Sequence, residues 1–140
     1  VRRVVAMGGN FHGTDFRGLA GRMGEIASKH PHLTALLAPG AAQQLAGSAW
    51  LREFANGPDT VPDIVYTSIY SPADTVVTPA SASMLQAAPG ADVANIDSGQ
   101  WYDGYAPYHA LMPRDPLYAE LTTWGLLRDV GDHVPPARFG

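Results

Sequence analysis

Three short runs rich in β-branched residues constrain the fold of this 140-residue chain more than any other feature. They are RRVVAMGG at 2–9, DIVYTSIYS at 63–71 and ADVANID at 91–97. Short apolar runs of this composition predict buried strands. Stretches with helical periodicity separate them, and such alternation predicts parallel crossovers. We therefore expect an α/β fold with about three parallel strands and flanking helices.

Two helical segments are predicted between the first and second strands. One begins at Asp15 as its N-cap, with apolar residues recurring every three or four positions. The other covers 41–57, is interrupted near Gly47 and restarts at Ser48, which caps its second half. The residues of this second half that are predicted to face inward are Leu51 and Phe54.

Two further helical segments flank the third strand. A short one is predicted over 80–90, and the last helix opens at Asp115 as N-cap with Pro116 as its first residue. The folded domain is expected to cover 1–130, followed by a disordered tail over 131–140. The apolar face of the last helix is predicted to consist of Leu117, Leu121, Trp124 and Leu127.

The composition argues against several classes of function. The net charge is −4 and no cluster of Lys or Arg is present, which argues against a nucleic acid as partner. Cysteine is absent, so the chain has neither a disulfide framework nor a thiolate nucleophile. No apolar run reaches the roughly 18 residues of a transmembrane helix, and the first residues lack the apolar stretch of a signal peptide.

An acid and a histidine follow two of the predicted strands. Asp74 lies just past the second strand, in YSPADTVVTP, and His109 lies in the loop after the third. Functional groups gather at the carboxyl ends of strands in open α/β sheets. A carboxylate bonded to one histidine nitrogen fixes the tautomer, so that the other nitrogen can act as a base toward a hydroxyl. The alternatives are a turn or cap role for Asp74 and a structural loop role for His109.

Three segments of the chain together resemble the C-terminal half of α/β-hydrolase lipases and esterases. They are VRRVVAMGGNFHGTD (1–15), PDIVYTSIYSPADTVVTP (62–79) and YHALMPRDPLYAEL (108–121). The resemblance runs from Val1 to about Arg128. It is closest to bacterial triacylglycerol lipases that carry a TPHHGT-like loop after the sixth strand.

The resemblance implies a serine esterase or lipase in which a Ser-His-Asp triad hydrolyses a carboxylic ester. Asp74 would be the acid, His109 the base, and His12 would line the substrate site. The excursion over 15–57 would be a cap or lid. The resemblance further implies an ester or lipid substrate, no metal or organic cofactor, and secretion to the extracellular space. The alternatives are a backbone-bonded loop histidine at 12, and an excursion that simply packs on the sheet.

The chain departs from the family pattern at the nucleophile. No serine has the G-x-S-x-G pattern of the nucleophile elbow: Ser48 is predicted to cap a helix and Ser98 to lie in a loop. The oxyanion-hole donors of the family would be missing too, and Asn10 stands where many relatives have proline. We therefore expect these 140 residues alone to be inactive toward esters, and to rely on a missing N-terminal half or on self-association through an unpaired strand edge.

Two questions remain open from the sequence. His30 and His32 resemble a chelating pair, but no third ligand lies at a spacing typical of zinc sites, so a solvated loop is predicted. The rival to the esterase hypothesis is a non-catalytic, truncated α/β-hydrolase module that binds a partner through its open sheet. An in-frame G-x-S-x-G upstream of Val1 would favour the esterase.

Overall fold

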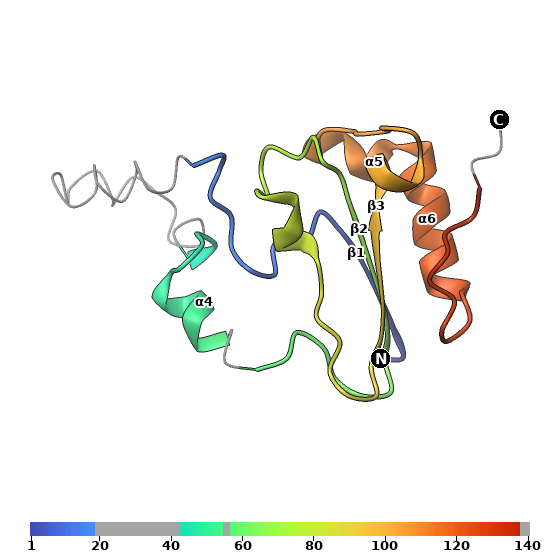
Figure 1. The fold of residues 1–140 in the computed structure, drawn as a ribbon, viewed down its shortest axis with the longest axis horizontal. Coiled ribbons are helices and arrows are strands. Elements are labelled where there is room, and N and C mark those ends of the chain that lie inside the picture. Colours follow the sequence, from blue (N-terminus) through green and yellow to red (C-terminus); the bar gives the residue numbers. More distant parts are fainter. Residues whose placement is uncertain (19–42, 55–56, 138–140) are drawn as a thin grey trace, which may run out of the picture.

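The centre of the molecule is one parallel sheet. The computed structural model describes residues 1–18, 43–54 and 57–137 (Figure 1). The strands, in their order across the sheet, are β1 (Arg3–Met7), β2 (Val65–Tyr70) and β3 (Asp92–Asp97). All three coincide with the runs predicted from the sequence, so the expected α/β fold with three parallel strands is confirmed.

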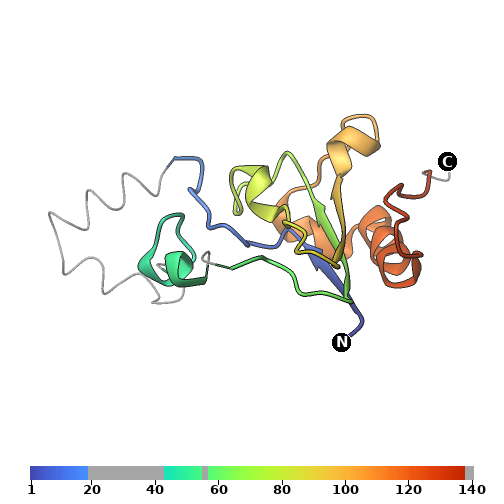
Figure 2. The same ribbon diagram turned by 60° about the horizontal axis from the view of Figure 1, so that its bottom comes forward.

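Helical elements cover both faces of this sheet. In chain order they are α4 (Ala49–Phe54), η1 (Ala80–Ser83), α5 (Ser98–Trp101), η2 (His109–Arg114) and α6 (Pro116–Leu127). The long helix α6 packs on one face against β1 and β2, whereas η1 contacts β2 from the other face (Figures 1 and 2). The central strand β2 is therefore buried along its whole length.

The alternating side chains of β2 serve the two faces separately. Thr67 points to α6, where a β-carbon added to Gly125 would lie 3.0 Å from it. Ser68 points the opposite way and donates a hydrogen bond of 2.5 Å to the carbonyl of Ser83 in η1. Both hydroxyl side chains are fully buried. Thr67 therefore packs closely against α6, and Ser68 binds η1 through a hydrogen bond.

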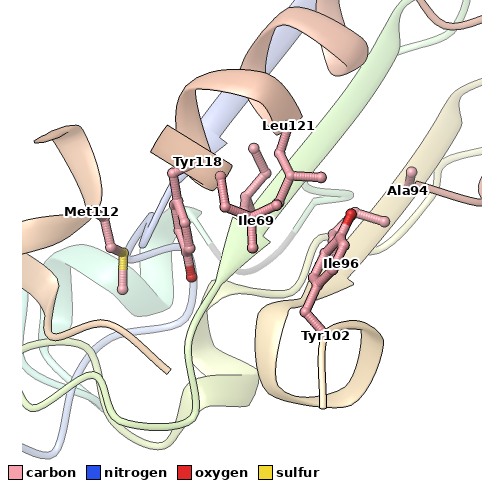
Figure 3. Close-up of a cluster of buried hydrophobic side chains, with 8 residues drawn as sticks. Ile69, Ala94, Ile96, Tyr102, Met112, Tyr118 and Leu121 are labelled. Atoms are coloured by element: carbon pink, nitrogen blue, oxygen red, sulfur yellow. The ribbon is translucent and has the colours of Figure 1, made fainter. Parts of the chain in front are cut away.

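The apolar core lies between the sheet and α6. Figure 3 shows that its side chains come from β2, β3, α6 and the segment between β3 and α6. Its buried members are Ile69, Ala94, Ile96, Tyr102, Met112, Leu117, Tyr118 and Leu121. The segment that carries His109 is thus anchored through Met112, which is 1% exposed.

The start of α6 is as predicted, but its inward face differs at the end. Asp115 accepts a hydrogen bond of 3.2 Å from the amide of Tyr118, and Pro116 is the first helical residue. Leu127, predicted to face inward, is 73% exposed. Arg128 takes the inward position instead, because it lies about three turns after Leu117 on the same side of the helix. Its guanidinium is buried against β2.

The cap predicted for α4 is also confirmed. Of the two residues predicted to face inward, Leu51 does so and Phe54 does not. The hydroxyl of Ser48 accepts a hydrogen bond of 3.1 Å from the amide of Leu51, which is buried. Phe54 is 64% exposed. It lies four residues after Trp50, so the two rings contact each other on the helix surface, with centroids 4.4 Å apart.

The helix predicted from Asp15 does not begin there. Phe16 and Arg17 have positive φ angles of 48° and 58°, and the carboxylate of Asp15 accepts from the amide of Arg17 in a local turn. The continuation of this predicted helix, and most of the insertion predicted over 15–57, lie outside the described residues. The helical stretch predicted over 80–90 is limited to η1, because Leu85 instead pairs its backbone with the side-chain amide of Asn95.

The predicted disordered tail is wrong for residues 131–137. The amide of Gly131 donates to the carboxylate of Asp92, and the hydroxyl of Tyr102 donates to the carbonyl of Pro136 at 2.8 Å. These long-range hydrogen bonds tie the segment to Asp92 and Tyr102, and it runs beside α6 (Figure 1). Residues 138–140 lie outside the described part. Within that described part, no helix combines the length and apolar character needed to cross a membrane.

Candidate active site

Asp74 is held in a tight turn directly after β2. Its amide donates to the carbonyl of Ser71 at 3.2 Å, and its side chain is almost fully buried. One carboxylate oxygen, Oδ1, accepts from the amides of Val76 and Val77 at 2.7 and 3.0 Å. Because this oxygen is fixed by the backbone, the other oxygen, Oδ2, has a defined direction.

His109 meets that second oxygen. It is the first residue of η2, after β3 and α5, and its Nδ1 lies 2.8 Å from Oδ2 of Asp74. An ionised carboxylate can only accept, so Nδ1 donates to it, and in a neutral ring Nε2 is then left as an acceptor. The ring is 34% exposed, and Nε2 has no hydrogen-bond partner among the residues that the structure describes. The proximity predicted from the sequence is confirmed.

The end of β1 completes the setting of the pair. Gly8 has a positive φ of 53° and donates its amide to the carbonyl of Ile69 at 2.9 Å. A β-carbon added to Gly8 would lie 3.0 Å from Nδ1 of His109 and 3.2 Å from Oδ2 of Asp74. Gly8 was not among the site residues predicted from the sequence, where it belongs to the run RRVVAMGG. The signal that could have singled it out is a glycine at the carboxyl end of a parallel strand, where close approach is expected.

A buried tyrosine links the two segments behind the pair. The hydroxyl of Tyr118 donates to Oγ of Ser98 at 3.0 Å, and it also interacts with the side chain of Ser71. Burial raises the pKa of Tyr118 to about 12, against the lowering effect of the Ser98 hydrogen bond. The tyrosine therefore stays protonated at ordinary pH and ties the turn after β2 to the start of α5.

The buried position of Ser98 corrects the sequence analysis. It was predicted to lie in a loop, but it opens α5 beneath the cap formed by Asp97, whose carboxylate accepts from the amides of Gly99 and Gln100. Its hydroxyl is occupied by Tyr118. No serine hydroxyl in the described ranges hydrogen-bonds to His109, whose ring is paired with the carboxylate of Asp74.

Of the other histidines that the structure describes, neither His12 nor His133 contacts the pair. The Nε2 of His12 lies 2.9 Å from the carbonyl of Met84 and 3.3 Å from a carboxylate oxygen of Asp59. This matches the backbone-bonded interpretation, and its contact with a substrate stays a prediction. His30 and His32 lie outside the described residues. Within 1–18, 43–54 and 57–137, no group of three or more histidine or acidic side chains could hold a metal ion.

Comparison with models of known protein families gives no match, and comparison with curated proteins gives none either. The fold and the site define an α/β protein with three parallel strands and a histidine–carboxylate pair at the carboxyl edge of its sheet.

Proposed function

We propose that this chain carries the base and the acid of a serine-dependent carboxylic ester hydrolase with an α/β-hydrolase fold. One observation supports it above the others. A buried carboxylate, fixed on one oxygen by two amides, lies 2.8 Å from Nδ1 of His109, while Nε2 of the same ring is left open. A histidine held in this way is the general base of nucleophilic hydroxyl chemistry.

In the proposed reaction, His109 handles the proton in both half-reactions. Its Nε2 accepts the proton of a serine hydroxyl as the serine oxygen attacks the ester carbonyl, and then donates it to the leaving alcohol oxygen. Water then attacks the acyl-serine in the same manner and releases the carboxylic acid. Asp74 stabilises the imidazolium that forms twice in this cycle. The serine and the oxyanion-hole donors would come from a part of the protein other than these 140 residues.

The test is the turnover of a short-chain chromogenic ester by the intact protein. We expect His109→Ala to lower kcat by about 10⁶-fold and Asp74→Asn by about 10⁴-fold, because the base transfers the proton whereas the acid orients it. His133→Ala serves as the matched control, since this exposed histidine contacts Asp92 instead of the pair. A folded His109→Ala variant with near-native turnover would show that another residue is the base.

A second candidate function is a non-catalytic module that binds a partner. It is favoured by the outer side of β1, which has no strand partner among the described residues. A fluorophosphonate reagent separates the two, because it labels an activated serine covalently. Labelling of the intact protein that is lost in His109→Ala supports the hydrolase. Absence of both labelling and hydrolysis favours the module. Secretion, which the resemblance implies, belongs to the hydrolase proposal.

A further inference from the structure

The orientation of Asp74 depends on a backbone segment that another loop holds. The two amides that fix its Oδ1 belong to Val76 and Val77. The hydroxyl of Thr14 donates to the carbonyl of Val76, which lies between these two amides in the chain, at 2.6 Å, and accepts from the amide of Thr78, which follows them, at 3.1 Å. One hydroxyl therefore binds the segment that fixes the carboxylate at two points.

Thr14 is itself held firmly in the loop after β1. Its amide donates to the carbonyl of Gln44, and its carbonyl accepts from the amide of Ala46, each at 3.0 Å. Its hydroxyl also accepts from the amide of Phe16 at 3.1 Å. The residue is 1% exposed, so water cannot replace the three hydrogen bonds of its hydroxyl without rearrangement. The loop after β1 thus acts as a rigid support for the loop after β2.

The next residue reinforces this connection. The amide of Asp15 donates to the carbonyl of Thr78 at 2.8 Å, and the hydroxyl of Thr78 donates to the carboxylate of Asp15 at 2.5 Å. That hydrogen bond from Thr78 lowers the pKa of Asp15 below its usual value. Each of the two loops therefore donates a hydrogen bond to the other.

We infer that Thr14 is a positioning residue for the Asp74–His109 pair, acting through the Val76–Val77 amides on the carboxylate; its catalytic meaning rests on the hydrolase proposal. Loss of the hydroxyl removes the hydrogen-bond partner of the carbonyl of Val76 and of the amides of Thr78 and Phe16. The segment then relaxes, Asp74 loses its fixed direction, and the Nδ1–H of His109 loses a well-placed acceptor.

The variants that test this are Thr14→Val, which keeps shape without the hydroxyl, and Thr14→Ser, which keeps the hydroxyl. Thr60→Val is the matched control. Thr60 is equally buried, and its hydroxyl likewise donates to a carbonyl, of Gln86, and accepts from an amide, of Ala88. The residues that form these bonds lie before the first residues of β2 and β3, whereas Asp74 follows the last residue of β2. The control is therefore at the opposite end of the strands from the pair.

Two readouts are needed on the intact protein: the low-field proton resonance of Nδ1 of His109, and kcat for a chromogenic ester. We expect Thr14→Val to shift or broaden the resonance and lower kcat by about 10- to 100-fold with little change in KM. Thr14→Ser should restore both, and Thr60→Val should destabilise the protein with the resonance intact. An unchanged resonance in Thr14→Val, or its loss in Thr60→Val as well, would overturn the inference. If the wild-type protein cleaves no ester, the resonance still tests positioning, so failure of the hydrolase proposal is seen separately.

Discussion

Gly8 is the position at which a single added carbon would most directly disturb the Asp74–His109 pair. Its φ of 53° lies in the region that favours glycine. The two hydrogen-bonded atoms of the pair, Nδ1 of His109 and Oδ2 of Asp74, occupy the space beside its α-carbon. The neighbouring atoms have little room to give way, because Oδ1 of Asp74 is tied to two amides. Substitution here should therefore affect chemistry as well as stability.

We predict that Gly8→Ala displaces His109 and lowers ester turnover of the intact protein by about 10²-fold, the loss typical of a misplacement near 1 Å. Gly104→Ala is the control. Gly104 also has a positive φ, of 78°, but no atom lies within 4 Å of an added β-carbon. Gly104→Ala should therefore lower the free energy of unfolding by only about 1–2 kcal/mol, through backbone strain, and should keep its activity. Equal activity of the two variants would contradict a specific role for the space at Gly8.

At the scale of elements, Arg128 joins the end of α6 to the sheet. Its buried guanidinium donates to Oγ1 of Thr67, to the carbonyl of Tyr66 and, at 2.5 Å, to the carboxylate of Asp92. The same carboxylate accepts from Gly131 and lies 3.1 Å from Nε2 of His133. One ion pair thus connects β2, β3, α6 and the tail.

The pKa of Asp92 gives this connection a defined dependence on pH. Burial by itself would raise the pKa of Asp92, but the hydrogen bonds from Arg128, Gly131 and His133 outweigh burial and lower it. A carboxyl whose pKa is lower in the folded state stabilises the fold fully above its unfolded pKa, near 4. That contribution is lost as the pH falls through the lowered, folded value.

We predict that Asp92→Asn lowers the free energy of unfolding by about 3 kcal/mol at pH 7, because it leaves the buried Arg128 charge without its counter-ion. The difference from wild type should shrink as the pH falls below about 4. Urea unfolding across pH measures both effects. Asp129→Asn, at an exposed neighbour, is the control and should change little. If the difference in free energy of unfolding between Asp92→Asn and wild type did not vary with pH, the ion pair with Arg128 would not be the way in which Asp92 stabilises the fold.

At the scale of the whole molecule, no other strand of the described residues pairs with the outer side of β1. The carbonyl of Arg2 accepts from the amide of Val65, and the amide of Gly8 donates to Ile69. Ladder bonds of a parallel strand use every second residue, so the N–H of Val4 points toward β2 and that of Val5 points outward.

We predict that the 140-residue chain by itself cleaves no ester and self-associates through β1, because an unpaired apolar edge invites another strand. Val5→Pro should reduce association, since it removes an outward N–H and none of the ladder bonds to β2, although it also trims a side chain that packs against the core. Val4→Pro, the control, should instead lower stability by about 1 kcal/mol or more through loss of a ladder hydrogen bond. Size-exclusion chromatography with light scattering measures the association. A wild-type chain that is monomeric at every concentration would refute the pairing.

The sequence by itself determined the elements whose signals are local. The three β-branched runs became the three parallel strands, Ser48 and Asp115 became caps, and the order of strands brought Asp74 and His109 to one edge. These features follow from periodicity, capping chemistry and the direction of parallel strands, each of which is written in a few consecutive residues.

Only the tertiary structure decided the features that depend on distant residues. Arg128 replaced Leu127 as the inward residue because polar partners on β2 and β3 could accept its donors. Thr14 supports Asp74 by a hydrogen bond to a loop more than sixty residues away. Gly8 likewise lies against the side chains of Asp74 and His109, which are even more distant in the chain. No local pattern encodes which buried donor meets which acceptor, since each bond forms only when the packed chain leaves both groups without water.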